Sequence, residues 1–462
     1  MVRIFRHYLS AKLLLIVALE ALVFVLSVRL GLALNLSSLG VGQADTLPLV
    51  PTAAITLGML IVMNGVGLYS ADHWRDLQTV PARLITAALI AIGLILVITF
   101  LPPAFVAEPR RMAITLTAIL TGVALIRFIF YKWDRLFLFK PRILVLGTGS
   151  RVAEFAESAQ RNRNQLIVGY VPFEIPTQQY VPASLILPMT PGESLQSIAK
   201  KHAIDQIVIA MRDRRGKLPV HELVECRLQG VRIIELATAF EREYRKVSLE
   251  SISASWIMLD EGFSQGALRS GVKRLFDLVA STVLLILSFP IIVLAAVAIL
   301  IESGFPLVYR QERVGQGGRT FSMYKLRSMT QDAECDGKPR WAAASDVRTT
   351  RTGRIMRKLH IDELPQIINV LKGEMSFVGP RPERPYFVDQ LVKKIPYYSL
   401  RHSIKPGITG WAQVRYPYGA SLEDTTEKLQ YDLYYVKNHT LFLDMVILLA
   451  TIEVVFSGKG AR

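Results

Sequence analysis

Cysteine is scarce in this sequence: only Cys226 and Cys335 occur among its 462 residues, and they lie far apart. Two distant cysteines provide neither a disulfide framework nor the closely spaced ligands of a structural zinc site. The scarcity instead favours a protein whose soluble parts face a reducing compartment.

Acidic residues are also few, since 38 Asp and Glu stand against 54 Lys and Arg, a formal net charge of +16 at pH 7. A chain this basic is expected to meet anionic partners, such as phospholipid headgroups, phosphorylated substrates or nucleic acid. No nucleic-acid recognition motif occurs, and the positive charge lies beside apolar segments. We therefore expect membrane lipids and phosphorylated compounds as partners, and no nucleic acid.

Long apolar runs, by contrast, are abundant, and 51% of the residues are hydrophobic. Crossing a bilayer takes roughly 20 apolar residues, and four runs are long enough: residues 12–34, 52–70, 83–101 and 112–131. The first run exceeds the apolar part of a signal peptide and lacks a small-residue cleavage site, which predicts a retained helix. Lys and Arg gather before the first run and after the fourth, with Arg110 and Arg111 as exceptions. Residues 1–140 are therefore predicted to form a four-helix transmembrane bundle with both ends in the cytoplasm.

Residues 141–265 differ in character from the apolar region before them. The stretch PRILVLGTGS is typical of an apolar strand that ends in a glycine-rich turn, and the runs LIVGYV, QIVIAM and RIIELA alternate with helix-compatible segments. Such alternation indicates a parallel sheet with crossover helices. The sequence therefore predicts a Rossmann-like parallel α/β domain on the cytoplasmic side.

The glycine-rich turn raises the question of a nucleotide cofactor. Gly147 and Gly149 fit the first two glycines of the dinucleotide fingerprint, but Val152 occupies the third position. After LIVGYV, where an acid would bind the ribose, only Glu174 is available. The pattern favours a Rossmann-like domain without a catalytic nucleotide cofactor.

A fifth apolar segment spans residues 275–301 and is interrupted by Pro290, next to Ser288 and Phe289. Proline removes a backbone hydrogen bond and bends a helix. Lys and Arg lie on both sides of the segment, which is awkward for a helix that crosses the membrane. The charges therefore favour a re-entrant helix that enters the bilayer, bends and leaves on the same face, with a spanning helix as the alternative.

Downstream, the stretch RKLHIDELPQIINVLKGEMSFVGPRPERP places Asp362 and Glu363 just before Pro365, where a new helix is expected to begin. Unpaired amides at a helix start stabilise negative charge. Adjacent carboxylates can hold a divalent cation, and an Asp held there can attack phosphorus. Taken alone, however, the motif favours a kinked helix with an acidic N-cap and a surface acid.

The basic neighbours of this acid pair favour phosphate chemistry. Arg357 precedes it at helical spacing with other cations, and Lys325 and Arg327 lie on one side of an expected strand. Arg381 stands between Pro380 and Pro382, which stiffen its backbone. Concentrated Arg suits bidentate binding of phosphate, while a basic patch resting on anionic lipid is a compatible alternative.

Five motifs in order resemble the bacterial sugar transferases, the monotopic polyprenyl-phosphate phosphoglycosyltransferases. They are KRLFDLVAS, YRQERVGQGGRTFSMYKLRSM, LHIDELPQIINVLKGEMSFVGPRP, RHSIKPGITGWAQV and YDLYYVKNHTLFLD, all within residues 270–462. The resemblance implies that residues 266–462 form a mainly α monotopic catalytic domain with the re-entrant helix at 275–301. The four added helices and the Rossmann-like domain resemble the large members that initiate exopolysaccharide or O-antigen synthesis at the bacterial inner membrane.

The resemblance also implies a reaction: transfer of a sugar-1-phosphate from a UDP-sugar to undecaprenyl phosphate, with release of UMP. Asp362 would be the nucleophile and would contact Mg²⁺, or Mn²⁺ in its place, and Glu363 would support the metal or act as a base. The substrate-binding residues implied by the matching motifs are Lys325, Arg327, Arg357, Pro380, Arg381, Pro382 and Gln413. A homodimer is compatible with the resemblance.

Two other functions stay open at this point. One is a membrane-anchored NAD(P)-dependent enzyme that modifies nucleotide sugars, against which the incomplete glycine fingerprint counts. The other is a non-catalytic scaffold of a polysaccharide assembly complex, which an altered acid pair would have favoured. Neither the transferred sugar nor the polysaccharide follows from the sequence.

Overall fold

The computed structural model describes most of the chain: residues 2–4, 7–9, 11–36, 49–69, 83–87, 90, 109–135, 140–161, 166–172, 180–188, 194–211, 218–251, 266–330, 348–416, 419 and 421–457. The chain divides into two compact units. One unit is residues 134–261, and the other combines residues 1–133 with residues 262–462. The predicted division into three domains, at 140 and 265, stays a prediction.

The N-terminal part begins with a short antiparallel hairpin of β1 (Val2–Ile4) and β2 (His7–Leu9), followed by three long helices. The helices are α1 (Ala11–Leu36), α2 (Leu49–Gly65) and α4 (Pro109–Arg135). The predicted run 83–101 lies mostly outside the described residues, apart from helical residues 83–87 and residue 90. Among the described residues, two segments are long and apolar enough to cross a membrane, Leu13–Leu30 and Arg269–Ser303. They indicate a membrane-associated protein, and the four-helix bundle stays a prediction.

These three helices are joined by apolar packing and by one buried ion pair. Phe24, Met59 and Val123, from different helices, belong to one buried cluster. Beside it, Arg127 Nε donates to Glu20 Oε1 at 2.9 Å, and Arg127 Nη1 donates to the Leu68 carbonyl at 3.0 Å. Because each buried charge has a partner, the cluster avoids the penalty of an isolated charge in an apolar setting.

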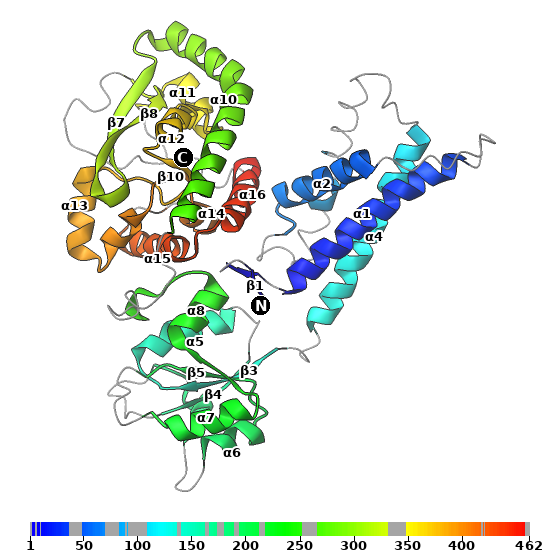
Figure 1. Ribbon diagram of the computed structural model, residues 1–462, viewed down its shortest axis with the longest axis vertical. Helices are drawn as coiled ribbons and strands as arrows, with labels where there is room; N and C mark the ends of the chain where they lie inside the picture. The colour runs from blue at the N-terminus through cyan, green and yellow to red at the C-terminus, as the bar shows by residue number, and fades with distance from the viewer. Residues whose placement is uncertain are drawn as a thin grey trace. The chain divides into compact units, whose positions relative to one another are not determined.

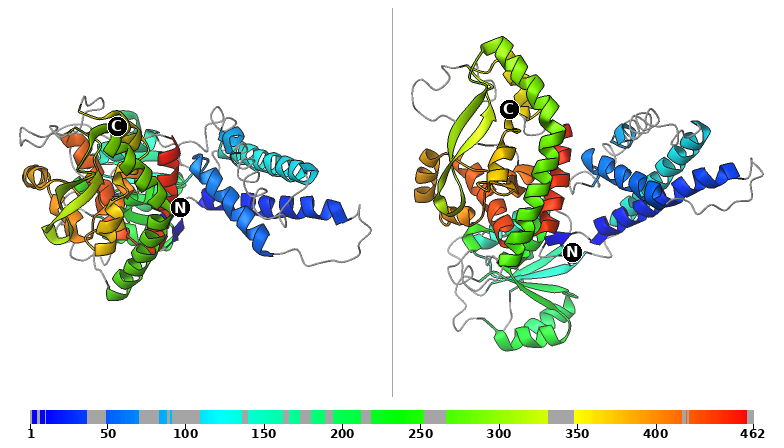
Figure 2. Two further views of the ribbon diagram at one scale, coloured as in Figure 1. Left: turned by 90° about the horizontal axis from the view of Figure 1, so that it is seen from above. Right: turned by 45° about the horizontal axis from the view of Figure 1, so that its top comes forward.

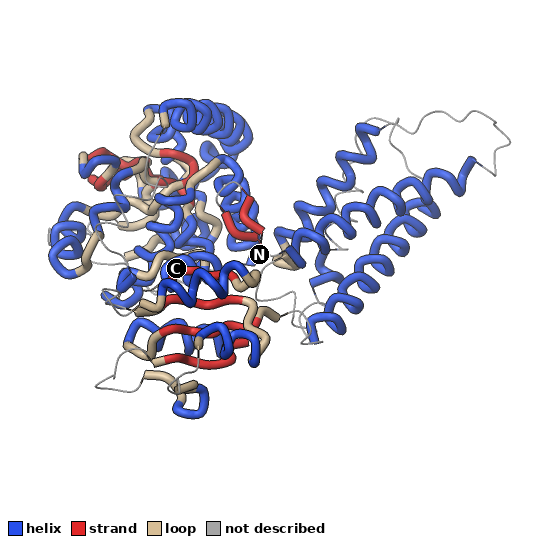
Figure 3. Tube along the Cα trace, turned by 60° about the horizontal axis from the view of Figure 1, so that its bottom comes forward, coloured by secondary structure: helices blue, strands red, loops and turns tan. Residues whose placement is uncertain are grey.

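The middle unit contains the parallel sheet that the sequence predicts. Its strand order is β4-β3-β5-β6, and every neighbouring pair is parallel. The strands are β3 (Arg142–Leu146), β4 (Leu166–Val171), β5 (Gln206–Ile209) and β6 (Arg232–Glu235). Figure 3 shows these strands side by side between helices. Strands covered on both faces are expected to be continuous apolar runs, as these are.

Helices cover both faces of this sheet (Figure 1). The first face carries α5 (Ser150–Arg161) and α8 (Leu236–Tyr244), whose Phe155 and Phe240 pack into one core. The second carries α6 (Leu195–Lys201) and α7 (Val220–Leu228), which form a separate core around Ile207. The glycine-rich turn after β3 leads directly into α5, and Val152 is fully buried. At the third fingerprint position the chain therefore uses a core residue.

The C-terminal part, from residue 266 onward, is mainly helical, as predicted. It begins with α10 (Ala267–Ser303) and an antiparallel hairpin of β7 (Val308–Val314) and β8 (Thr320–Leu326). The next elements are α11 (Arg351–Lys358), the 3₁₀ turn η8 (Ile361–Glu363), α12 (Gln366–Lys372), β9 (Ser376–Val378) and α13 (Pro385–Lys394). The last are η9 (Tyr398–Ser403), β10 (Gly407–Thr409), α14 (Trp411–Arg415), α15 (Leu422–Asn438) and α16 (Leu441–Ser457). Strands β9 and β10 pair in parallel.

Helix α10 contains the apolar segment 275–301 and continues through Pro290. In Figures 1 and 2 its green ribbon changes direction along its length. Near its start, Lys273 Nζ donates to Asp444 Oδ2 at 2.7 Å, in α16. At its end, the Glu302 carboxylate accepts the amides of Arg351 and Thr352, each at 2.8 Å, at the start of α11. Both ends of α10 are thus bound to the same unit.

Candidate active site

The acid pair lies in the turn η8, between α11 and α12. Helix α11 begins at the cap Thr350, whose side chain accepts the Gly353 amide, and the chain then turns sharply at His360, where φ is 55°. A left-handed conformation is unfavourable for a residue other than glycine and is often found at functional sites. Pro365 immediately precedes α12, close to the predicted helix start. The turn therefore presents Asp362 and Glu363 between two helices.

Glu363 is held by two cations from distant parts of the chain. Its Oε1 accepts from Lys325 Nζ at 2.8 Å and from Arg381 Nη2 at 2.7 Å. Burial alone would raise the pKa of this carboxyl, but Arg381 and Lys325 outweigh it and hold the pKa of Glu363 well below its usual range. Glu363 is therefore an anion at neutral pH that fixes the side chains of Lys325 and Arg381.

Asp362 differs from Glu363 in its hydrogen bonding and in the direction of its pKa shift. It is only 7% exposed, and its carboxylate accepts no hydrogen bond from the part of the chain that the structure describes. Burial raises the pKa of Asp362, Lys325 opposes that shift, and the nearby Glu363 charge adds to it. Arg357 and His360 also favour the anion. Asp362 is thus a shielded carboxylate without hydrogen-bond partners beside a set of cations, which suits a nucleophile.

The turn Gly379–Pro382 pairs with the loop that begins at Pro406. The Gly379 amide donates to the Thr409 carbonyl at 2.9 Å, and the Gly407 amide donates to the Pro380 carbonyl at 3.0 Å. A Cβ at Gly407 would lie 2.0 Å from the Gly379 nitrogen, so only glycine permits this approach. Beside the turn is a small hollow, lined in part by Pro380, Arg381 and Pro382.

Arg401 and His402 line the same hollow and were assigned no role from the sequence. Arg401 Nη2 donates to the Arg381 carbonyl at 3.0 Å and pairs with Asp432 Oδ2 at 2.7 Å. Burial and the adjacent Arg401 lower the pKa of His402 to about 4, so this ring is neutral at pH 7. Arg401 lies in the stretch RHSIKPGITGWAQV, which was part of the family resemblance. Its contacts with α15 and with the turn, however, cannot be predicted from the spacing of residues in the sequence.

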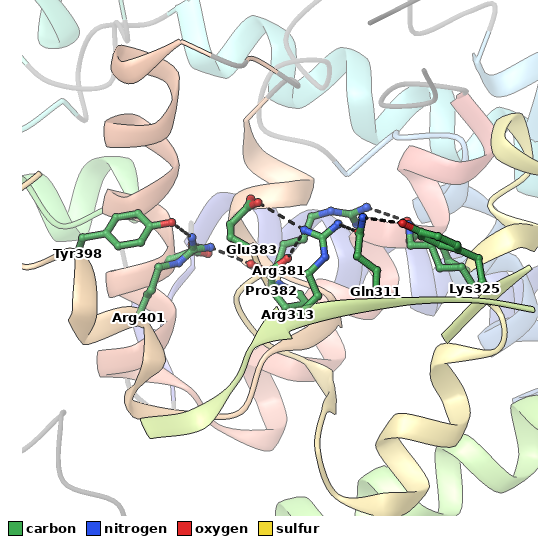
Figure 4. Close-up of polar contacts among 11 residues, drawn as sticks. Gln311, Arg313, Lys325, Arg381, Pro382, Glu383, Tyr398 and Arg401 are labelled. Carbon is green, nitrogen blue, oxygen red and sulfur yellow. Dashed lines mark hydrogen bonds and ion pairs between the residues drawn. The ribbon is translucent and has the colours of Figure 1, made fainter. Parts of the chain in front are cut away.

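Arg313 is another residue to which the sequence assigned no role in the site. Its Nη1 donates to the Pro382 carbonyl at 3.1 Å, and the same atom lies 3.6 Å from Glu383 Oε2. Its Nη2 also bonds to Gln311. Figure 4 shows the labelled side chains from Tyr398 to Lys325 in one row along this turn. Arg313 and Arg401 therefore hold the backbone of the turn through its carbonyl oxygens.

Three of the predicted substrate-binding residues are engaged elsewhere. Arg327 Nη2 donates to the Ser303 and Gly304 carbonyls at the end of α10, at 2.7 and 2.5 Å. Arg357 Nη1 donates to Thr349 Oγ1 at 3.1 Å, and Gln413 Nε2 donates to the Ile408 carbonyl at 3.3 Å. The structure thus brings Lys325, Arg381 and the acid pair together, and it ties Arg327 to a helix end. The binding roles of these three residues stay predictions.

The arrangement offers few protein ligands for a metal ion. Within the described ranges no group of three or more His, Cys, Asp and Glu side chains could hold one. Asp362 and one oxygen of Glu363 are free of hydrogen bonds, whereas Glu363 Oε1 is engaged by both cations. Mg²⁺ is often bound by one or two carboxylates together with water and substrate phosphates. The pair therefore fits a cation that arrives with a diphosphate rather than a metal cage built by the protein.

Replacing Arg401 by Met is expected to destabilise the fold, because it leaves the Asp432 carboxylate buried without its partner. The expected loss in the free energy of unfolding is about 3–5 kcal/mol. Burial already raises the pKa of Asp432 to about 6 with Arg401 present, and the variant raises it further. Since a raised native pKa penalises the ionised folded state, the loss grows from pH 5 to pH 8. Unfolding in detergent at both pH values tests this, with the exposed Arg319→Met as control; equal losses at both would contradict the ionic cause.

The C-terminal part of the chain also resembles proteins of known family. The pattern described as "Bacterial sugar transferase" matches residues 268–458. A UDP-N-acetylgalactosamine-undecaprenyl-phosphate N-acetylgalactosaminephosphotransferase of Aeromonas hydrophila is 48% identical over 191 residues, 41% of this chain and 45% of that protein. A UDP-glucose:undecaprenyl-phosphate glucose-1-phosphate transferase of Klebsiella pneumoniae is 35% identical over 268 residues, 57% of each chain. The chain thus spans about half the length of these two relatives.

A shorter relative is matched almost completely. The protein named uncharacterized sugar transferase EpsL of Bacillus subtilis is 41% identical over 191 residues, which are 41% of this chain and 90% of the relative. Coverage of nearly the whole relative at this identity shows common descent of the matched 191 residues. Together with the acid pair and its cations, it establishes that this chain belongs to the bacterial sugar transferase family.

Proposed function

We propose that the protein transfers a hexose-1-phosphate from a UDP-sugar to undecaprenyl phosphate, releasing UMP and forming undecaprenyl-diphosphate-sugar. This would be the first membrane step of exopolysaccharide or O-antigen synthesis. The observation that carries the proposal is Asp362, a buried carboxylate that accepts no hydrogen bond from the described residues and lies beside the cluster of Glu363, Lys325 and Arg381. The activities for which two relatives are named, both undecaprenyl-phosphate sugar phosphotransferases, support it.

In the first displacement, Asp362 attacks the phosphorus that bears the sugar. An aspartyl oxygen–phosphorus bond forms, and the bond from that phosphorus to the bridging oxygen breaks, so that UMP leaves with the electron pair. Lys325 and Arg381 stabilise the negative charge that develops on the phosphate oxygens. Their positions beside Asp362 are set by Glu363, which both cations contact.

In the second displacement, an oxygen of undecaprenyl phosphate attacks the same phosphorus and Asp362 leaves as a carboxylate. The acceptor phosphate is already ionised at neutral pH and needs no strong base. Glu363, whose pKa is well below its usual range, is a weak base and is better suited to holding the cations. A Mg²⁺ or Mn²⁺ ion held by Asp362 and Glu363 would supply further neutralisation of the phosphate oxygens.

The same proposal places α10 in the bilayer as a re-entrant helix. Its central side chains Ile286, Leu287 and Leu294 expose 67, 68 and 70% of their surface, as lipid-facing residues would. Both helix ends are held by the same unit, through Lys273 and Glu302. A helix that crossed the membrane would instead leave its ends on opposite faces. The acid pair would then lie at headgroup level on the cytoplasmic face of the inner membrane, below a multi-pass four-helix bundle.

Labelling of single cysteines is expected to place both ends of α10 on one face. We expect Val272→Cys and Phe305→Cys, both exposed positions near the ends, to react with a membrane-impermeant maleimide in inverted vesicles and to be protected in intact spheroplasts. The background lacks Cys226 and Cys335. Ser38→Cys, in a loop that the sequence predicts to be external, should give the reverse pattern. Opposite labelling of the two α10 positions would establish a spanning helix.

The reaction itself is tested by UMP release from detergent-solubilised protein supplied with undecaprenyl phosphate, Mg²⁺ and each of a panel of UDP-sugars. We expect release that depends on the lipid and on one or a few of the donors, which would also identify the sugar. If protein shown to be folded releases no UMP with any donor, the result would favour a scaffold role, or an activity of the middle unit, over the proposed reaction.

A further inference from the structure

The short hairpin at the N-terminus contacts the catalytic part of the chain through one histidine. His7 is fully buried, and its Nδ1 lies 2.8 Å from Tyr434 Oη in α15. Its ring meets Trp411 edge to face, with centroids 5.4 Å apart. Trp411 and Tyr434 are themselves neighbours, at 6.1 Å. His7, Trp411 and Tyr434 thus form an aromatic cluster, which we call the N-terminal clamp, between β2 and two C-terminal helices.

Trp411 connects this clamp to the hollow. It is the first residue of α14 and follows β10 directly, after Gly410. Strand β10 pairs with β9 and hydrogen-bonds to the turn Gly379–Pro382 through the Gly379 and Gly407 amides. A Cβ at Gly410 would lie 2.2 Å from the Gly379 carbonyl oxygen, so little free space separates the loop from the turn. A shift of Trp411 is therefore transmitted to the residues that line the hollow.

A second connection from the N-terminal helices reaches the same loop. Asn64 Nδ2, at the end of α2, donates to the Leu449 carbonyl of α16 at 2.7 Å. Two residues further along α16, the Thr451 hydroxyl lies 2.7 Å from the Thr409 hydroxyl of β10. The hairpin and α2 thus hold the segment Gly407–Arg415 at two points. Neither contact involves the acid pair.

We propose that His7 is a positioning residue: through the N-terminal clamp it orders the segment Gly407–Arg415 and so supports the turn Gly379–Pro382, which carries Arg381, one of the two cations proposed to bind the donor phosphates. The kinetic part of this proposal rests on the proposed function, and the structural part does not. Because the contact does not involve the acid pair, its loss should weaken donor binding while leaving the chemical step nearly intact. The N-terminal part of the chain would then adjust the affinity of the enzyme for its soluble substrate.

The test compares full-length His7→Ala with wild type and with His221→Ala, a matched control whose side chain is 90% exposed in the middle unit. Amide hydrogen exchange in detergent, without substrate, is expected to become about tenfold faster within Gly407–Arg415 in His7→Ala, because an aromatic edge contact and a hydrogen bond are lost. The KM for the UDP-sugar is expected to rise about tenfold while kcat falls less than about threefold. Tyr434→Phe removes the hydroxyl alone and should cause a smaller change. In the Tyr434→Phe background, His7→Ala should raise the exchange rate and the KM by a smaller factor than it does in the wild-type background.

The outcomes separate the clamp from the reaction. Unchanged exchange within Gly407–Arg415 would overturn the clamp, whatever the activity. Faster exchange with unchanged KM would overturn the positioning role, as would an equal fall of activity and folded fraction. A wild-type protein that releases no UMP would count against the proposed function, and the exchange data would still decide whether His7 orders the loop.

Discussion

Asp362→Asn is expected to reduce UMP release by at least about 10³-fold, because an amide cannot form the aspartyl–phosphorus bond of the first displacement. The variant keeps the shape of the side chain, so the hollow beside Arg381 should persist. Donor binding should therefore survive the change. Initial rates of UMP release at saturating UDP-sugar, with undecaprenyl phosphate present, measure the effect.

The same substitution is expected to make the folded protein more stable at neutral pH. Burial raises the pKa of Asp362 above its ordinary value of 3.8, so the folded state binds the proton more tightly than the unfolded chain. As pH rises through and above that ordinary value, ionisation increasingly penalises the folded state, and the penalty is complete once pH exceeds the native pKa. Asn removes it. The unfolding midpoint of the variant should exceed that of wild type at pH 7, and the difference should vanish near pH 3.

Asp389→Asn is the matched control for both measurements, because Asp389 is exposed on α13. It should change neither the rate nor the midpoint appreciably. If Asp362→Asn releases UMP at a rate within tenfold of wild type, the proposed overall reaction still holds. The covalent aspartyl intermediate is then excluded. An inactive variant with a lower midpoint would point instead to a structural role for this carboxylate.

Glu363→Gln is expected to slow UMP release by about 10²-fold, because Lys325 and Arg381 lose the anion that holds them beside Asp362. The substitution should also move the acidic limb of the pH–rate profile. The Glu363 charge contributes to the raised pKa of Asp362, so its removal lowers that pKa. Since the nucleophile is the ionised form, the rate should persist to lower pH relative to its own maximum.

Measuring kcat for wild type and Glu363→Gln between pH 4 and pH 8 gives the position of the acidic limb in each. Glu225→Gln is a suitable control, because Glu225 lies in the middle unit and pairs there with the exposed His221. If Glu363 were an essential general base, Glu363→Gln would instead lose nearly all activity at every pH. An unchanged limb would show that Glu363 and Asp362 are not coupled through their charges.

The two carboxylates show which features of the site can be predicted from the sequence and which cannot. Their place before Pro365, in a basic surrounding, was evident from residue types and spacing. Their opposite electrostatic states were not, since Lys325 and Arg381 lie 38 and 18 residues from Glu363. Both cations contact Glu363, and neither donates a hydrogen bond to Asp362 in the described structure. Only the folded chain distinguishes the anchored anion from the one without partners.

Arg327 and Arg401 illustrate the same limit. Arg327 lies two residues after Lys325, just past the end of β8, and this spacing predicts two side chains on one side of the strand with the same role. The end of α10, however, presents the Ser303 and Gly304 carbonyls, and Arg327 satisfies them. Arg401 looked unremarkable in the sequence, yet it holds the Arg381 carbonyl and pairs with Asp432 in α15. A side chain's partner depends on which elements meet, and spacing within one element does not report that.

What the sequence by itself determined are the features that depend on local chemistry. Apolar length predicts α1 and α10, alternation of apolar runs predicts the parallel sheet of the middle unit, and Asp362–Glu363–Leu364–Pro365 predicts acids at a helix start. The tertiary structure alone decided the electrostatic difference between Asp362 and Glu363, the support of the turn by Arg313 and Arg401, and the contact of His7 with Trp411. The reason is physical. Propensity and hydropathy act over a few residues, whereas pKa values and side-chain partners depend on burial and on distances between segments that only folding brings together.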